Sequence, residues 1–432
     1  MSAVAAPRRR QAGPAPGAMA AVPRAEVLAF RTALALILLG VADDAFWHPE
    51  RGTGAADHLV SGLSPLAIGL AVALAYPRLR AGLRAIAAVA CGTLAVAAGA
   101  VDGYRHVAVD RLAGDDVTAM LAGLAGAALI ALAIGVLWRS RRLDERPARR
   151  YARRFAMGAV SLIAGYLVLL PAAIAIVATH KARSPVVAVD LGAPYESVML
   201  RTHDGLKLAA WYVPSRNGAA VIAFPGRSQP VPHARMLVRH GYGVLLLDRR
   251  GEGESEGGYN AFGWGGEADV AAAVGFLRGR PEVDADRIGG LGLSVGGELL
   301  LQTAARTRSL RAVVSEGAGV RSLAEHLHTP DVGRIQRWLS NWVVQTGALA
   351  VLSSTAPPDD LTQLIAEIPP RDVLLIQAEH GAGGEELNRV YVEAAGEPTS
   401  LWRATGGHTG ALAAQPPAYE RRVIGFFDRA LR

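Results

Sequence analysis

Cysteine is nearly absent from this chain of 432 residues. The one cysteine, Cys91, lies in an apolar run, which excludes an intrachain disulfide, a CxxC zinc site and a cysteine-ligated cluster. Lysine occurs only at Lys181 and Lys207, so arginine carries almost all of the positive charge, as expected for a GC-rich genome. Charged residues make up only 19% of the chain, and a mean hydropathy of +0.23 excludes a disordered or collagen-like chain.

The positive charge is unevenly distributed. The net charge of +7 and the pI near 9.8 suggest a nucleic acid or an anionic membrane as a partner. Residues 1–183, however, carry a net charge of +10, whereas residues 184–432 carry −3. We therefore expect no nucleic-acid partner, and we look for a membrane function in the first part.

Residues 26–183 contain apolar segments long enough to cross a bilayer, whose core of about 30 Å needs roughly 20 residues of helix. We predict five spans, of which the first is the weakest: Val27–Trp47, Leu59–Tyr76, Leu83–Val101, Val117–Trp138 and Phe155–Thr179. Arg84, near the start of the third span, is expected to extend its side chain to the membrane interface. Residues 1–25 lack an apolar core, which predicts a disordered tail and not a signal peptide.

The arginine content of the segments between the spans alternates between high and low. It is highest between the fourth and fifth spans, in residues 139–154. The positive-inside rule then predicts a multi-pass protein of the cell membrane with a cytoplasmic N-terminus and everything after Thr179 outside the cytoplasm. A pore or transporter is the alternative for this unit, but Asp43 and Asp44 fall near a span end, where acidic residues are interfacial. The Ala/Gly run Gly123–Ala128 indicates close helix packing.

Residues 184–432 alternate short strands with helices, a pattern typical of a mostly parallel sheet covered on both faces. The expected strands are Tyr195–Arg201, Leu206–Val213, Ala219–Phe224, Gly243–Leu247, Arg287–Gly292, Leu310–Val314, Val373–Gln377 and Ser400–Trp402. The expected helices include Val231–His240, Glu267–Leu277, Glu298–Ala305 and Pro417–Leu431. In such a fold, ligands bind at the carboxyl ends of the strands.

One of these strand ends carries the motif Gly292-Leu293-Ser294-Val295-Gly296. A nucleophile on a strained strand-to-helix turn requires small residues at both two-residue offsets, and the following helix start stabilises negative charge. Ser294 is therefore the candidate nucleophile.

The segment from Tyr195 to Leu431 resembles the α/β-hydrolase family, close to its serine aminopeptidase and dienelactone hydrolase-like branches. The resemblance rests on Thr202–Gly205 with Leu208–Trp211, on the "D-x-R-G-x-G-x-S" turn Asp248–Ser255, on Asp284–Ile288 and on the Ser294 motif. It implies an α/β-hydrolase fold after an α-helical transmembrane unit, with no metal and no cofactor.

In this family the base lies between the last strand and the last helix, which points to His408 in Gly406–Gly410. His326, His328 and His380 also follow Ser294 in the chain. The resemblance assigns the oxyanion hole to the backbone N–H groups of Val295 and Arg227. Pro225 departs from the His-Gly pair usual at that loop, but a main-chain donor at Arg227 does not depend on it.

The acid that should orient His408, and so complete a triad with Ser294, is the least determined of these residues. The family places an Asp about three residues after the Val373–Gln377 strand, where this chain has Gly381. A glutamate can take that role, and four are available: Glu385, which we favour, then Glu386, Glu379 and Glu316. The alternative is that these glutamates only begin helices.

Ser322–Ile368 is longer than a simple connection and contains Trp338 and Trp342, which predicts a small helical cap at about 322–368. Two interpretations of its aromatic residues stay open: they bind acyl substrates, or they only pack on the domain. The sequence thus predicts a membrane-anchored serine hydrolase that cleaves an ester, thioester or amide of a small-molecule, acyl or peptide substrate, with the lipid bilayer as its other partner. An inactive hydrolase-fold scaffold and an acyltransferase are the alternatives, and the oligomeric state stays open.

Overall fold

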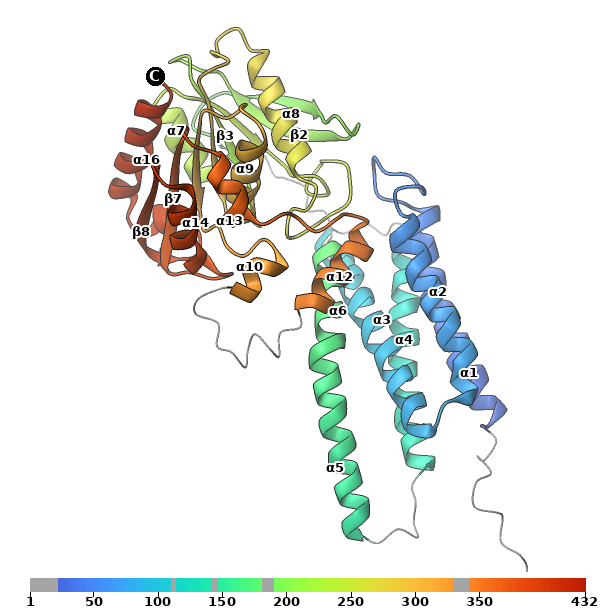
Figure 1. The fold of residues 1–432 in the computed structure, drawn as a ribbon. Coiled ribbons are helices and arrows are strands. Elements are labelled where there is room, and N and C mark those ends of the chain that lie inside the picture. The colour runs from blue at the N-terminus through green and yellow to red at the C-terminus, as the bar shows by residue number, and fades with distance from the viewer. Residues whose placement is uncertain (1–21, 110–113, 141–146, 181–189, 329–341) are drawn as a thin grey trace, which may run out of the picture.

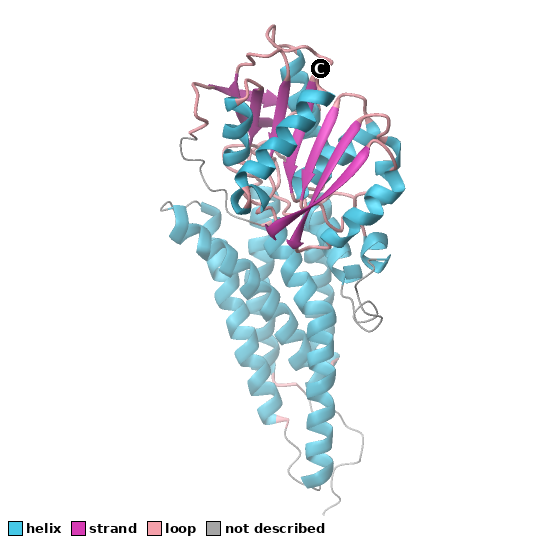
Figure 2. Ribbon diagram, turned by 90° about the vertical axis from the view of Figure 1, so that its left-hand side faces the viewer, coloured by secondary structure: helices cyan, strands magenta, loops and turns pink. Residues whose placement is uncertain are grey.

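The computed structural model describes residues 22–109, 114–140, 147–180, 190–328 and 342–432. They form a bundle of long helices from Arg24 to Thr179 and an α/β part from Glu196 onward (Figure 1). The α/β part lies over one end of the bundle, as both views show (Figures 1 and 2). The predicted tail, residues 1–25, lies largely outside the described residues.

Five helices of the bundle are long and apolar enough to cross a membrane, and they match the five predicted segments: Arg24–Trp47, Leu59–Arg78, Ala81–Ala100, Val117–Arg139 and Tyr151–Thr179. Their elements are α1 (Arg24–Ala42), η1 (Asp43–Trp47), α2 (Leu59–Ala75), η2 (Tyr76–Arg78), α3 (Ala81–Val109), α4 (Gly114–Arg139), α5 (Pro147–Ala164), η3 (Gly165–Leu169) and α6 (Leu170–Thr179). Pro171 lies in the first turn of α6, directly after the π-helical η3, where its ring is tolerated.

Helices α3 and α4 approach each other closely through glycines. A Cβ on Gly92 would lie 2.6 Å from the carbonyl oxygen of Gly126, and one on Gly99 would lie 2.8 Å from the Cα of Gly123. Small residues allow two backbones in a membrane to make many dispersion contacts. The Gly123–Ala128 run is therefore a helix-packing surface, as its composition predicts.

Arg84, near the start of α3, pairs with an acidic residue of another helix. Its Nε lies 2.8 Å from Glu26 Oε1, and its side chain is only 11% exposed. Arg139 Nη2 contacts the other oxygen of Glu26 at 3.3 Å, and the Tyr76 hydroxyl donates to the same carboxylate at 3.4 Å. The cluster ties α1, η2, α3 and α4 together.

An eight-stranded sheet in the order β1-β2-β4-β3-β5-β6-β7-β8 forms the centre of the α/β part. Its strands are β1 (Glu196–Arg201), β2 (Lys207–Val213), β3 (Ala220–Phe224), β4 (Gly243–Leu247), β5 (Ile288–Leu293), β6 (Ala312–Glu316), β7 (Asp372–His380) and β8 (Thr399–Gly407). β2 pairs antiparallel with β1 and β4, and the other neighbours are parallel. Strands β3 to β6 are buried throughout, which explains their apolar and small residues, with Glu316 at the end of β6 as the exception.

Helices cover both faces of this sheet, as predicted (Figure 2). One face packs on α7 (Val231–Arg239), α15 (Ala411–Ala414) and α16 (Pro416–Ala430). The other face packs on α8 (Glu267–Arg278), α9 (Val295–Arg306), α13 (Leu361–Leu364) with η4 (Ile365–Glu367), and α14 (Asn388–Ala395). Because the parallel strands all end at one edge, the loops that follow β3, β5, β6, β7 and β8 meet there.

The segment predicted as a cap contains α10 (Leu323–His328), α12 (Trp342–Ser353) and α13, whereas Trp338 lies outside the described residues. Helix α12 packs against α6 of the bundle, where Leu349 joins Ala175, Ala178 and Trp264 in one buried cluster. The Ala261 N–H also donates to the Ala178 carbonyl at 2.8 Å. The cap therefore contacts the helical bundle, an arrangement that the sequence pattern did not indicate.

Candidate active site

Ser294 occupies the turn between β5 and α9 with φ 52° and ψ −127°, a conformation that non-glycine residues rarely adopt. Its N–H donates to the Glu316 carbonyl at 2.7 Å, and its own carbonyl accepts from Gly297 N–H at 2.8 Å. These bonds hold the strained turn in place. The hydroxyl is thereby presented at the carboxyl edge of the sheet.

The glycines around Ser294 are required by close backbone contacts. A Cβ on Gly292 would lie 2.5 Å from the carbonyl oxygen of Gly296. A Cβ on Gly296 would lie 2.5 Å from the Pro225 carbonyl oxygen. The turn, the start of α9 and the loop after β3 can come together only because neither position carries a side chain.

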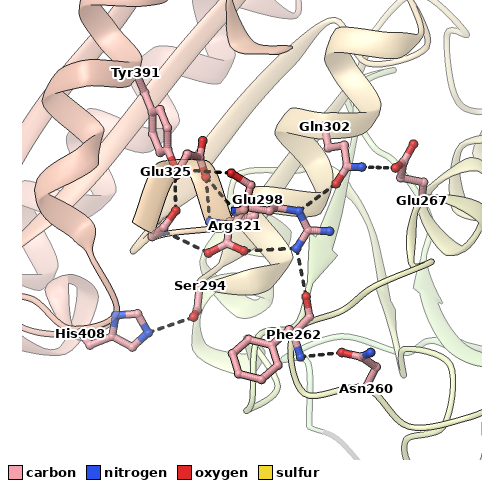
Figure 3. Close-up of polar contacts among 12 residues, drawn as sticks. Asn260, Phe262, Glu267, Ser294, Glu298, Gln302, Arg321, Glu325, Tyr391 and His408 are labelled. Atoms are coloured by element: carbon pink, nitrogen blue, oxygen red, sulfur yellow. Dashed lines mark hydrogen bonds and ion pairs between the residues drawn. The ribbon is translucent and has the colours of Figure 1, made fainter. Parts of the chain in front are cut away.

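Three residues from separate loops meet at this turn. His408, directly after β8, places Nε2 2.9 Å from Ser294 Oγ, and Figure 3 shows the ring facing the serine. The other ring nitrogen, Nδ1, lies 2.5 Å from Glu385 Oε1. A Cβ on Gly317 would lie 3.1 Å from His408 Cε1, so the absence of a side chain there makes room for the imidazole. The arrangement is a continuous Ser–His–Glu contact chain.

Glu385 begins η5 (Glu385–Leu387) and is only 1% exposed. Its Oε2 accepts a hydrogen bond from Ala378 N–H at 2.8 Å, and its Oε1 accepts from Ala382 N–H at 3.3 Å. A Cβ on Gly381 would come within 2.8 Å of Glu385 Cδ. The backbone of the loop thus fixes this carboxylate at the place left open by Gly381.

The other three glutamates lie elsewhere. Glu386 is half-buried, and Glu379 is exposed at the end of β7. Glu316 is buried behind the turn, where it accepts from Ala411 N–H at 2.9 Å and from the Tyr419 hydroxyl at 2.7 Å. Burial alone would raise the pKa of Glu316, but the hydrogen bond and charge of His233 and these two donors lower it. Of the four candidates, only Glu385 contacts His408 in the part of the chain that is described.

The remaining histidines after Ser294 also lie apart from it. The His326 ring lies against Trp342 at a centroid distance of 4.4 Å with the ring planes tilted by 35°, and burial lowers the pKa of His326. His380 is exposed at the end of β7. His328 ends α10. Among the described histidines, His408 alone contacts the serine hydroxyl.

The loop assigned to the oxyanion hole lies directly beside Ser294. A Cβ on Gly226 would lie 3.2 Å from the Ser294 Cβ and 2.6 Å from the Leu293 carbonyl oxygen. Arg227 follows with an exposed side chain, and Val295 is buried in the first turn of α9. Both backbone segments flank the same serine, although Pro225 replaces the histidine that is usual at this loop.

The turn that resembles "D-x-R-G-x-G-x-S" is held together by its own polar side chains. Ser255 Oγ donates to the Asp248 carbonyl at 2.8 Å and accepts from Ala209 N–H at 2.9 Å. Arg250 pairs with Asp269 of α8 at 2.7 Å and with Asp204 at 2.9 Å. These contacts join the opening hairpin to the sheet, so this motif is structural in the present geometry.

Asp248 in that turn is 1% exposed. Burial, with the nearby charges of Glu252 and Glu254, raises the pKa of Asp248 to about 7, although hydrogen bonds from Glu254 N–H and Gln229 oppose the shift. Gln229 Nε2 donates to it at 2.6 Å. The carboxyl group therefore titrates near neutral pH.

A buried polar network behind the nucleophile helix was missed by the sequence analysis (Figure 3). Arg321 contacts Glu298 at 3.3 Å and Gln302 at 2.8 Å, both on α9. It also donates to the Phe262 carbonyl at 3.0 Å. The one sequence signal was the pair Glu298 and Gln302, polar residues one turn apart on an otherwise apolar helix face. The network joins α9 to the segment that carries Phe262.

No group of three or more His, Cys, Asp or Glu side chains suited to a metal ion occurs among the described residues.

Comparison with known proteins identifies the family. The model of the X-Pro dipeptidyl-peptidase (S15) family matches residues 168–404, more than half of the chain. The chain belongs to the S15 family. The resemblance to α/β-hydrolases is thereby confirmed, with S15 as the matching branch.

Curated relatives match shorter stretches. The α/β hydrolase domain-containing protein WAV2 of Arabidopsis thaliana is 31% identical over 121 residues, which are 26% of this chain and 39% of WAV2. An uncharacterized protein of Mycobacterium tuberculosis is 37% identical over 106 residues, 23% of this chain and 37% of that one. The chain thus spans less than half the length of these relatives.

Solved structures resemble the α/β part. The esterase Pf2001 of Pyrococcus furiosus matches 58% of this chain and 99% of its own, with 21% identity and a TM-score of 0.47. At this identity the likeness concerns the fold alone.

Proposed function

We propose that this S15 protein is a membrane-anchored serine hydrolase that cleaves an ester, thioester or amide bond through an acyl-enzyme. The observation that carries the proposal is the contact chain from Ser294 Oγ to His408 Nε2, at 2.9 Å, and from His408 Nδ1 to Glu385, at 2.5 Å. Three loops from three different strands converge there, and the strained φ of Ser294 supports a functional reason for the turn.

In this mechanism, Ser294 Oγ attacks the substrate carbonyl carbon while His408 Nε2 takes its proton. Glu385 accepts the Nδ1–H bond, which keeps the imidazole in the correct tautomer and stabilises the imidazolium. The Val295 and Arg227 N–H groups hold the oxyanion. His408 then protonates the leaving group, and a water molecule that it activates releases the acyl group from Ser294.

Turnover of a panel of esters, thioesters and amides with varied acyl length tests this function. We expect hydrolysis by the full chain and a loss of about 10⁶-fold in kcat in Ser294→Ala, because nucleophile and base act as one unit. A folded chain that hydrolyses no member of the panel, or a Ser294→Ala variant as active as the parent, contradicts the proposal and favours an inactive scaffold.

Membrane placement is supported by the five apolar helices and by the arginines of residues 139–154. We propose that the N-terminus is cytoplasmic and that the α/β part lies outside the cytoplasm. A phosphatase reporter fused after Arg432, active only outside the cytoplasm, is expected to be active. A C-terminal reporter that is active only in the cytoplasm contradicts this orientation.

A further inference from the structure

A cavity of about 1140 Å³ lies between the helical bundle and the α/β part. Its walls come from α1, α2, α3, α4 and α6 of the bundle, from Glu50–Ser61, from α12 and from Gly257–Trp264. We call it the interdomain chamber. Its volume lies slightly above the range of about 300–1,000 Å³ that is usual for small-molecule sites, and neither Ser294 nor His408 lines it.

The chamber changes in polarity along its depth. Leu34, Val72 and Cys91 line the part that lies within the bundle. Asp44 and His180, which face each other at 3.5 Å, line the end next to the α/β part. From Leu34 to Asp44 the helix rises about 15 Å, half the hydrocarbon thickness of a bilayer. The chamber therefore has the depth and the polarity profile of one lipid leaflet.

The chamber has room for a long ligand because small residues line it on both sides. On the bundle side these are Gly40, Ala95, Ala98, Ala119 and Ala122. On the side of α12, a Cβ on Gly347 would find no atom within 4 Å. A larger side chain on Gly347 would therefore extend into open space at the chamber wall.

One segment, 263–264, contacts both the chamber and the start of the nucleophile helix. Trp264 lines the chamber, while a Cβ on the preceding Gly263 would lie 2.8 Å from the Val295 side chain, next to Ser294. In the same segment, the Phe262 carbonyl accepts a hydrogen bond from Arg321 at 3.0 Å (Figure 3). A molecule in the chamber thus lies against the segment that contacts the nucleophile helix.

We propose that the interdomain chamber binds an acyl chain of a bilayer lipid, and that an acyl lipid is the class of substrate presented to Ser294. This inference rests on the proposed function and membrane placement. Hydrolysis then breaks the acyl C–O bond of the lipid ester. Water supplies a hydroxyl to the acyl group and a proton to the alcohol oxygen, which gives a fatty acid and a deacylated lipid.

The binding step is tested with the full chain in phosphatidylcholine nanodiscs that contain phosphatidylcholine with a photoreactive diazirine in mid-chain. We expect crosslinks in Gly257–Trp264 in both the parent and Ser294→Ala. Ala98→Phe and Gly347→Phe, which fill the chamber from opposite walls, should reduce them at least about tenfold. Val96→Phe, on the same helix as Ala98 but at an exposed position outside the chamber, is the matched control and should leave them unchanged.

The substrate step is tested with long-chain and acetyl esters of the same alcohol. Both filling variants should lower the ratio of long-chain to acetyl kcat/KM about tenfold or more. Acetyl ester hydrolysis should stay within about twofold of the parent. Crosslinks or kcat/KM ratios that the filling variants do not change would overturn the inference. Absence of any Ser294-dependent hydrolysis would overturn the proposed function, and the crosslinking result alone would then decide whether the chamber binds an acyl chain.

Discussion

The carboxylate of Glu385 lies in the space that a side chain on Gly381 would need. A Cβ on Gly381 would come within 2.8 Å of Glu385 Cδ, and the same carboxylate reaches His408 at 2.5 Å. Gly381 stands where the resemblance to α/β-hydrolases leads us to expect an aspartate. A glutamate four positions later, one methylene longer, therefore reaches back over a residue that has no side chain.

Glu385→Gln is predicted to lower kcat about 10³–10⁴-fold with KM little changed, because an amide can stabilise the wrong tautomer of His408 and cannot stabilise its cation. Glu386→Gln and Glu379→Gln are the matched controls and should stay within about twofold of the parent in the same assay. An equal loss in Glu386→Gln would show that the wrong glutamate is assigned.

Gly381→Ala is predicted to lower kcat about tenfold to a hundredfold, since the new methyl group displaces the Glu385 carboxylate from His408. Gly275→Ala serves as the control, because a Cβ there meets no atom within 4 Å. Steady-state kinetics of both variants measure the effect. Parent-like kcat in Gly381→Ala would mean that the loop does not constrain Glu385.

Arg321→Met is predicted to destabilise the α/β part by about 3–5 kcal/mol, because it leaves the buried Glu298 carboxylate without its cation. The double variant Arg321→Met/Glu298→Gln removes that uncompensated charge and should recover much of the loss. Denaturant unfolding of the full chain in detergent, followed by fluorescence, measures both. A double variant less stable than Arg321→Met would argue against the pairing.

Asp248 is predicted to make stability depend on pH. Its pKa of about 7 in the folded chain exceeds its ordinary value of 3.8, so the folded state binds more protons between these values. Stability therefore falls as pH rises from about 4 to about 7, and the loss is complete above that range. The decrease in Tm between pH 5 and pH 8 should be smaller in Asp248→Asn than in the parent. An equal decrease in both proteins would exclude Asp248 as its source.

Local patterns were sufficient for much of the fold. The buried strands β3 to β6 are runs of apolar or small residues, apart from Glu316 at the end of β6, and the Ser294 motif combines a strand, a strained turn and a helix within a few residues. His408 could be placed because its loop has a fixed position in the chain order of this fold. Each of these signals lies within one short segment.

The remaining features depend on contacts between distant segments. The sequence favoured Glu385 over Glu386 without deciding between them, because only the folded Gly loop determines which carboxylate turns toward His408. Arg84 pairs with Glu26 only because α1 and α3 pack together in the folded chain. Arg321 likewise pairs with Glu298 only because the loop after β6 packs on α9. The contact of α12 with α6 likewise joins residues far apart in the chain.

Covalent labelling by a fluorophosphonate, read as the intact mass of the full chain and mapped by peptide analysis, tests the central claim most directly. The account predicts one adduct per chain, located on Ser294, absent in Ser294→Ala and formed far more slowly in His408→Ala. Folded protein that remains unlabelled, or labelling that persists in Ser294→Ala, would contradict it.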